Sequence, residues 1–219
     1  MTPLSEPLQT DLLFPHEESF SEDETTIRMV VAAISTAKTK GELGRVLARE
    51  VGRYTLHDLQ VIGGRLHAEL IRLPQPYRSR ISPYLTEQIF GGHHQLVSMF
   101  RSDQFSAMTG PITDELTFNG FCEIIPIGCT QWDEADSRLP VRYTTRHRLF
   151  YYLIAAFMMF VLERPGHPVG TPFPGGYNVE ERNGSFYCLI RDHEKEVPFS
   201  ICNFCPALQS SEDPKGSSW

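Results

Sequence analysis

The longest apolar run in this chain, residues 149–162, constrains the fold more than any other feature. It reads LFYYLIAAFMMFVL and holds 14 residues, whereas a helix rising ~1.5 Å per residue needs about 20 to cross a bilayer. A helix that is apolar on every face belongs at the centre of a core. We therefore expect a buried helix over residues 143–162, with Thr144 or Thr145 as its N-cap and His147 in the cap region or at the surface.

Helical periodicity also marks the N-terminal half of the chain. Apolar residues recur at helical spacing in residues 26–34 and again in residues 43–51, which predicts two short helices. A third helix is expected to begin at Thr55, whose hydroxyl can accept a hydrogen bond from the Asp58 amide. It should end before Pro74, because proline interrupts helical hydrogen bonding.

The middle of the chain is interrupted more often by proline and glycine. Residues 76–99 carry apolar positions at helical spacing, so we expect a helix that opens near Pro83 and is perturbed at the two glycines that begin at Gly91. Only one short helix is expected beyond it, near residues 114–122, because Pro126 should break a longer one.

The C-terminal part has a different composition, rich in proline and glycine. Residues 167–176 read HPVGTPFPGG, which excludes both a helix and an interior strand and predicts an ordered loop, either a rigid cover over the core helix or a binding loop. The Asn183-Gly184 pair then separates two alternating runs, residues 177–181 and 185–190, and predicts a β-hairpin with a type I′ turn. The fold class is thus mainly α, a helical core with a small C-terminal β-hairpin and Cys-rich loop module.

Charge is distributed unevenly and delimits the expected domain. Residues 1–24 hold seven of the 27 acidic residues and none of the 20 Lys and Arg residues. The rest of the chain is balanced, so it has no excess positive charge with which to bind nucleic acid. We expect a disordered acidic tail over residues 1–24, a single mainly helical domain over 25–209, and a second disordered tail over 210–219.

The termini and the cysteine content indicate a compartment. The N-terminus lacks the basic start and apolar stretch of a signal peptide, so we expect a cytoplasmic protein with no membrane association. A reducing cytoplasm disfavours structural disulfides, which leaves metal binding, redox chemistry or simple burial for the five cysteines.

Three of the cysteines have the spacing of metal ligands. Cys188 on the second hairpin strand is followed, after 13 residues, by Cys202-Asn-Phe-Cys205. Two thiolates separated by two residues can bend around one ion, and tetrahedral zinc holds such sulfurs at ~2.3 Å. A third cysteine on an adjacent hairpin strengthens this interpretation.

A closed site needs a fourth ligand, for which several residues are available. Cys122 or Cys129 would complete an all-thiolate site that suits zinc or an iron-sulfur cluster equally. His167, at the entrance of the Pro/Gly loop, would instead give a Cys₃His site that favours zinc, and His193 is a further candidate. The sequence leaves these alternatives open.

Two other interpretations compete with metal binding. Free cysteine also packs as a small hydrophobic side chain, so all the thiols can simply be buried. A redox pair at Cys202 and Cys205 is less favoured, because a thioredoxin-like motif opens a helix in a βαβ unit, whereas Pro206 follows here. His93 and His94 are adjacent and point about 100° apart on a helix, which favours a surface role.

These motifs together resemble a known family. HPVGTPFPGG, the Asn-Gly turn, FYCLI and ICNFCPA are similar to the C-terminal signature of domain of unknown function 2115, an uncharacterised family of methanogenic archaea. The similarity is specific over residues 165–209 and extends to LPQPYRS from Leu73 and to FVLERP before Gly166. Leu189 follows Cys188, where the family pattern usually has proline.

The resemblance implies a helical cytosolic protein of a strict anaerobe, without an established activity. It carries over four signature positions: Cys188, Cys202, Cys205 and His167. We therefore expect a non-catalytic metal-binding accessory protein with an unidentified protein partner, in which zinc is favoured over an iron-sulfur cluster. The alternative is a metal- or thiol-dependent enzyme that uses the region of Cys202 and Cys205.

Overall fold

The computed structural model describes residues 21–131 and 143–210. Within these ranges the chain forms seven α-helices and a small three-stranded sheet. The helices are α1 (Glu22–Ser35), α2 (Lys40–Val51), α3 (Leu56–Ile71), α4 (Tyr77–Thr86), α5 (Gly92–Arg101), α6 (Glu115–Thr130) and α7 (Thr145–Ala156). The prediction of a mainly helical fold with a small C-terminal sheet is confirmed.

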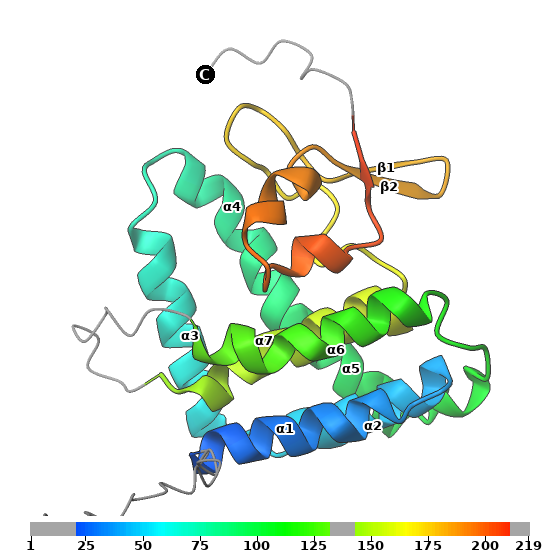
Figure 1. Cartoon of the computed structure of the whole chain (residues 1–219). Coiled ribbons are helices and arrows are strands. Elements are labelled where there is room, and N and C mark those ends of the chain that lie inside the picture. Colours follow the sequence, from blue (N-terminus) through cyan, green and yellow to red (C-terminus); the bar gives the residue numbers. More distant parts are fainter. Residues whose placement is uncertain (1–20, 132–142, 211–219) are drawn as a thin grey trace, which may run out of the picture.

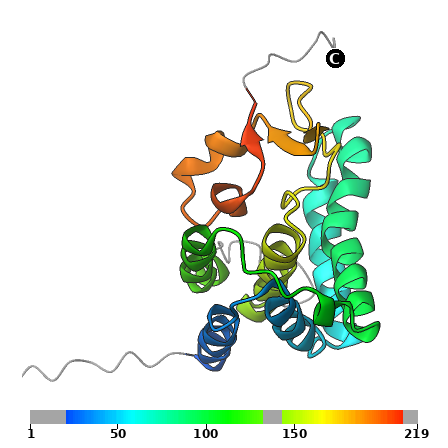
Figure 2. The same cartoon turned by 90° about the vertical axis from the view of Figure 1, so that its right-hand side faces the viewer.

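Helix α7 lies at the centre of the fold, as its sequence predicts. It continues into a π-helical turn, η3 (Phe157–Val161), and nearly every residue from Leu149 to Val161 is buried. Helices α1, α2, α3, α5 and α6 all contact α7, and Figure 2 shows it end-on with these helices around it. Burial on all sides satisfies a helix that has no polar face.

Local side-chain caps fix where three of the surrounding helices begin. Each carries a reciprocal capping box, in which a hydroxyl and a carboxylate bind each other's backbone amides: Ser21 with Glu24, Thr39 with Glu42, and Thr55 with Asp58. The predicted cap at Thr55 is confirmed. Because Ser21 caps α1, the helix begins at Glu22, three residues before the expected domain boundary. Residues 1–20 of the expected acidic tail and residues 211–219 of the C-terminal tail lie outside the described residues.

Two proline-based expectations were wrong. Pro83 lies inside α4, and the chain continues through a π-helical turn, η1 (Glu87–Gly91), into α5. Pro126 lies inside α6, which runs on to Thr130. Proline costs about 3 kcal/mol inside a helix, but α6 packs on both α1 and α7, and burial of its apolar side chains there offsets the lost hydrogen bond.

The C-terminal module consists of the sheet and two 3₁₀ turns. Strands β1 (Glu180–Arg182) and β2 (Ser185–Cys188) form an antiparallel hairpin, and β3 (Leu208–Gln209) pairs in parallel with β2. Asn183 and Gly184 have φ values of 52° and 77°, which confirms the predicted hairpin turn. The module covers α6 and α7 on the side opposite α1 and α2 (Figure 1).

A tyrosine of the core helix anchors this module. The Tyr152 hydroxyl donates a hydrogen bond of 2.9 Å to the Phe199 carbonyl between the two 3₁₀ turns. The Tyr152 side chain lies directly against Gly128 of α6, where a Cβ atom would collide with the tyrosine ring and hydroxyl. The rings of Phe121 on α6 and Phe204 in the module also meet edge to face at 5.7 Å. The module is therefore attached directly to the two central helices.

The Pro/Gly loop is held against α4. The Tyr77 hydroxyl donates to the Pro172 carbonyl at 3.2 Å, and the Tyr84 ring packs against Gly170, which has a φ of 87°. The loop thus lies between α4 and the module rather than over the core helix alone.

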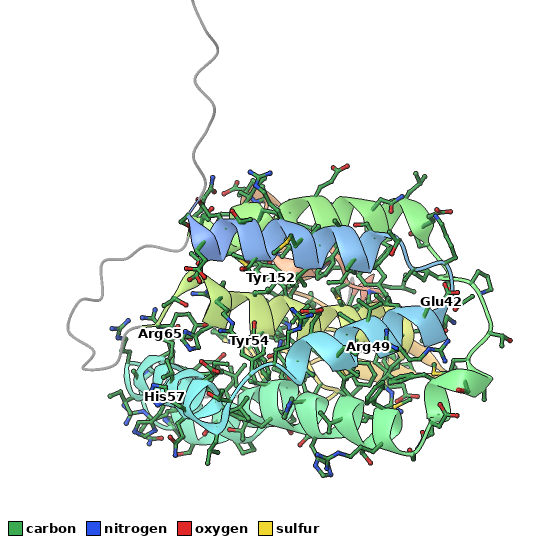
Figure 3. All side chains as sticks on the ribbon, turned by 90° about the horizontal axis from the view of Figure 1, so that it is seen from below. Glu42, Arg49, Tyr54, His57, Arg65 and Tyr152 are labelled. Atoms are coloured by element: carbon green, nitrogen blue, oxygen red, sulfur yellow. The ribbon has the colours of Figure 1, made fainter. Side chains whose placement is uncertain are left out.

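The N-terminus of α7 is fixed by contacts with α3 and with the segment between α2 and α3. The Tyr54 hydroxyl donates to the Arg146 carbonyl at 2.7 Å, and Figure 3 shows Tyr54 against α7. Thr144, the expected N-cap, donates its amide to His147 Nδ1 at 3.1 Å, and His147 Nε2 lies 3.3 Å from Asp58 Oδ1. His147 is thus a cap residue, and it is buried instead of exposed.

No helix in the described part of the chain is long and apolar enough to span a membrane.

The contact between Gly128 and Tyr152 yields a stability prediction. Gly128→Ala places a methyl group where the Tyr152 ring lies, and overpacking of this kind costs about 1–3 kcal/mol. Gly64→Ala is the control, because Gly64 lies on α3 with no neighbouring atom within 4 Å; alanine there should stabilise the helix by about 0.5–1 kcal/mol. Urea unfolding measures both, and equal effects would contradict the packing assigned to Gly128.

Burial of His147 yields a prediction of pH dependence. Desolvation lowers the pKa of His147 below the ordinary histidine value of 6.5, against the opposing charge of Asp58. The unfolded chain therefore takes up this proton at a higher pH than the folded protein. Neutral His147 thus makes its full contribution to the unfolding free energy above pH ~6.5, and this contribution declines as the pH falls below that value. His147→Gln keeps a capping side chain and should flatten the dependence of the unfolding free energy between about pH 6.5 and 5. Parallel profiles for the two proteins would contradict the assignment.

Candidate functional site

Three of the five cysteines meet in the C-terminal module. Cys188 ends β2, Cys202 lies in the 3₁₀ turn η5 (Ile201–Phe204), and Cys205 follows that turn. Cys188 belongs to a small apolar cluster with Val179 and Ala207, against which Cys205 also packs. The negative charges of Cys205 and Cys188 raise the pKa of Cys202, and the charge of Cys188 raises the pKa of Cys205. The parallel pairing of β2 with β3 brings this about, because it returns the chain after Cys205 to the side of Cys188.

Two of these sulfurs accept hydrogen bonds from backbone amides. Burial raises the pKa of Cys188, and hydrogen bonds from the amides of Ile190 and Arg191 oppose that rise. Burial likewise raises the pKa of Cys205, against hydrogen bonds from the amides of Ala207 and Gly166. Amide donors stabilise a negatively charged sulfur. The amides offset part of the cost of a thiolate at Cys188 and Cys205, but burial is the larger effect and the pKa of both thiols remains raised.

Cys202 has a different environment. It is buried, and desolvation raises the pKa of its thiol to about 12, although hydrogen bonding with the Ser200 side chain opposes the rise. Ser200 also caps the turn by accepting the Cys202 amide at 3.3 Å. The negative charges nearby include Glu194, a residue that its polar sequence context would place in water.

His167 approaches the same cluster from the Pro/Gly loop. Its ring meets Phe173 edge to face at 5.6 Å, and Phe173 packs on the cluster that contains Cys188. The residue before it, Gly166, is the one whose amide binds Cys205. Desolvation lowers the pKa of His167 to about 4, so the imidazole is neutral at physiological pH, the form in which histidine binds metals.

The other two cysteines lie elsewhere. Cys122 is buried in α6 and hydrogen-bonds to Ser35 of α1. Cys129, the penultimate residue of α6, is buried near Arg148 of α7. Both belong to the main helical core, whereas the small cluster of the module contains neither. The structure therefore groups Cys188, Cys202 and Cys205, and His167 reaches this group through the ring of Phe173.

Two polar side chains that sequence reasoning missed connect the segments bearing the thiols. Arg191 Nε donates to the Cys205 carbonyl at 3.4 Å, and its Nη1 donates to Asp192 Oδ1 at 2.8 Å. Gln209 donates to the Leu189 carbonyl at 2.8 Å and accepts the Asp192 amide at 2.9 Å. The only sequence signal for either residue is its closeness to a cysteine, because both act through contacts that the sheet creates.

The site is a group of neighbouring thiols rather than a preformed ligand shell. All five cysteines are free, and across residues 21–131 and 143–210 no set of three or more His, Cys, Asp or Glu side chains has the geometry to hold a metal ion. As a chemical class, thiols can bind soft divalent metals or undergo oxidation.

Comparison with known proteins agrees with the resemblance noted in the sequence. A family model described as an uncharacterized protein conserved in archaea (DUF2115) matches residues 39–210. A UPF0305 protein of Methanothermobacter thermautotrophicus is 35% identical over 83 residues, which cover 36% of this chain and 51% of that protein. A UPF0305 protein of Methanopyrus kandleri is 39% identical over 64 residues, covering 29% of this chain and 45% of that protein.

A third relative, a UPF0305 protein of Methanococcus maripaludis, is 43% identical over 49 residues, which cover 22% of this chain and 30% of that protein. The matched regions thus span about half the length of these relatives or less. No solved structure matches the chain significantly. The names of these relatives attribute no activity to them.

The burial of the thiols predicts their order of reaction. In the metal-free protein Cys205 should react first with a maleimide, because it is partly exposed while the other four cysteines are buried and react only through local opening. Mass spectrometry of digests taken over time measures the order, with urea-unfolded protein as the control in which all five label together. Labelling of Cys122 as fast as Cys205 would contradict the burial described here.

Proposed function

We propose that this chain, which belongs to the DUF2115 family of archaeal proteins, is a non-catalytic metal-binding accessory protein whose zinc ion is held by Cys188, Cys202 and Cys205. One observation carries the proposal. Cys188 at the end of β2 and Cys205, directly after the η5 turn, meet in one small cluster, and backbone amides donate to both sulfurs.

Simple burial accounts for this arrangement less well. A cysteine that only packs as a small hydrophobic side chain has no need of amide donors. Cys129 in the core illustrates this: burial raises the pKa of its thiol and the charge of Arg148 lowers it, with no contribution from an amide. Amide donors around Cys188 and Cys205 instead support a sulfur that carries negative charge, as it does when it binds zinc. The difference between the two environments favours metal binding in the module.

Zinc is favoured over an iron-sulfur cluster by the supply of ligands. A four-thiolate cluster would need Cys122 or Cys129 as its fourth ligand, and both lie in the main helical core. His167 lies beside the module cluster as a neutral imidazole, and three thiolates with one imidazole form a common structural zinc site. We therefore propose His167 as the fourth ligand.

Metal binding would contribute folding energy to the module. The sheet is small, with strands of three, four and two residues, and short strands alone are marginally stable. Zinc would fix the hairpin and the η5 turn to each other, and Tyr152 would connect them to the core helix. We propose that the module so fixed is a recognition surface for a protein partner in the cytoplasm of a methanogenic archaeon.

An enzyme is the second candidate function, and the partial exposure of Cys205 favours it. In one form of this candidate, the Cys205 thiol itself reacts with the substrate. In the other, a water molecule takes the place of the fourth zinc ligand and is activated by the metal. The number of protein ligands separates the alternatives, because a structural zinc site is closed by four and a catalytic one by three.

Elemental analysis of protein purified without oxygen tests the proposal. About one zinc per chain is expected, with strong loss of zinc in Cys202→Ser and full retention in the matched control Cys122→Ser, which removes a buried thiol from the main core. Replacement of zinc by cobalt should give charge-transfer absorption from three thiolates and a tetrahedral spectrum that changes in His167→Ala. Zinc-free protein, or zinc retained in Cys202→Ser, would overturn the proposal. Iron together with a brown chromophore would show that the site holds an iron-sulfur cluster and not zinc.

A further inference from the structure

We propose that Cys188 and Cys205 are the site of a reversible oxidation, in which the two thiols form a disulfide and make the C-terminal module responsive to redox state. The inference goes beyond the proposed function, because it requires two thiols and no metal ion. Both cysteines are free in the structure. In the reducing cytoplasm proposed above, disulfides are usually transient, so this bond would form only when an oxidant is present.

The two thiols lie in one small apolar cluster. Its buried members are Val179, Cys188 and Ala207, and Cys205 packs against them. In a cluster this small, Cys205 is a near neighbour of Cys188, as a disulfide partner must be. The cluster is also separate from the main helical core, so a bond formed there would change the module and leave the helices in place.

The backbone segments that carry the two cysteines are held together independently of the thiols. Parallel pairing of β2 with β3 places Cys188 opposite Gln209, shortly after Cys205 in the chain. The Ser210 amide donates to the Cys188 carbonyl at 3.3 Å, and Arg191 Nε donates to the Cys205 carbonyl at 3.4 Å. A disulfide would therefore link segments that the fold already places side by side, which is the condition for forming one without backbone movement.

The remaining cysteines are less suited to this reaction. Cys122 and Cys129 lie two turns apart on α6, about 10 Å along the helix axis, whereas a disulfide allows at most ~7 Å between Cα atoms. Cys202 is close to Cys205 in the chain and is the competing partner, but it belongs to neither apolar cluster of the described residues.

Exposure determines which thiol reacts first. Cys205 is partly exposed, whereas Cys188 is buried. A small-molecule disulfide would therefore exchange with the Cys205 thiolate, forming a mixed disulfide and releasing one small thiol. The Cys188 thiolate then attacks the Cys205 sulfur and releases the second small thiol. In total the two protein thiols lose two electrons and two protons, and the small-molecule disulfide gains them.

The bond would close a loop over residues 188–205. This loop contains the 3₁₀ turns η4 (Arg191–Glu196) and η5. A disulfide restricts the unfolded form of the segment it encloses more than the folded form. The oxidised module should therefore open less often, and a protease should cleave the segment between the two cysteines more slowly.

Oxidation of the full chain by glutathione disulfide tests the proposal. Reduced, chelator-treated protein is incubated without oxygen at increasing ratios of oxidised to reduced glutathione. Free thiols are then blocked with a maleimide, and an unreduced digest is analysed by mass spectrometry. The variants are Cys205→Ser, Cys188→Ser and the matched control Cys202→Ser, which removes a neighbouring thiol. Circular dichroism checks that each variant keeps its helices.

Wild type and Cys202→Ser are expected to give two peptides joined through Cys188 and Cys205, which dithiothreitol separates. Cys205→Ser should lose this product. Cys188→Ser should stop at the intermediate, with glutathione bound to Cys205, because the thiol that completes the exchange is missing. Oxidised wild type should also be cleaved more slowly between residues 188 and 205 than the reduced protein.

Three results would overturn the inference. They are a bond that joins Cys202 to Cys205, a disulfide that still forms to the wild-type extent in Cys188→Ser, and a folded wild type that forms none while the urea-unfolded chain oxidises. Should Cys188→Ser fail to fold, Cys188→Ala, which keeps a small apolar side chain, replaces it, and the bond mapped in the wild type decides if both fail. The zinc content of untreated protein is measured separately, so the proposed function can fail without affecting this result.

Discussion

Burial of α7 on every side is the constraint on which the rest of the structure depends. A helix without a polar face is stable in a water-soluble fold only when other elements cover it completely. Helices α1, α2, α3, α5 and α6 contact it directly, and the C-terminal module lies over the side that α1 and α2 leave open (Figure 1). The module therefore completes the core as well as carrying the thiols.

The polar contacts of α7 show how a nearly apolar helix determines the geometry around it. At its N-terminus, Tyr54 reaches it from the segment between α2 and α3, and Asp58 reaches it from α3. In its middle, the Tyr152 hydroxyl crosses α6 at Gly128 to bind the Phe199 carbonyl in the module. The hydrogen bonds of the Tyr54 and Tyr152 hydroxyls pair buried polar groups, and an unmade hydrogen bond there would cost about 1–3 kcal/mol. Together they fix the positions of the surrounding segments.

The module uses this attachment to bring distant thiols together. Cys188 and Cys205 lie on segments that pair through β2 and β3, and Arg191 and Gln209 connect those segments again by side-chain hydrogen bonds. Small sheets of this size gain little from their own cores. A bound metal ion would supply the stabilising energy that the short strands lack, which gives the proposed zinc a structural reason to be there.

The sequence by itself determined the features that depend on local pattern. The apolar run predicted α7, the hydroxyl of Thr55 predicted a cap, and the Asn183-Gly184 pair predicted the hairpin turn, because periodicity, capping and turn chemistry act over a few residues. The family signature likewise identified the residues around Cys188 and Cys202. Each of these follows from neighbours along the chain.

Tertiary structure alone decided the features that depend on distant contacts. Packing against α1 and α7 carries α6 through Pro126, and the parallel pairing with β2 creates β3, which no periodic pattern marks. The same pairing decides that Cys205 meets Cys188 while Cys122 faces Ser35 in the core. Local propensities are weak beside the free energy of burying whole elements, so the grouping of the thiols follows from how those elements pack.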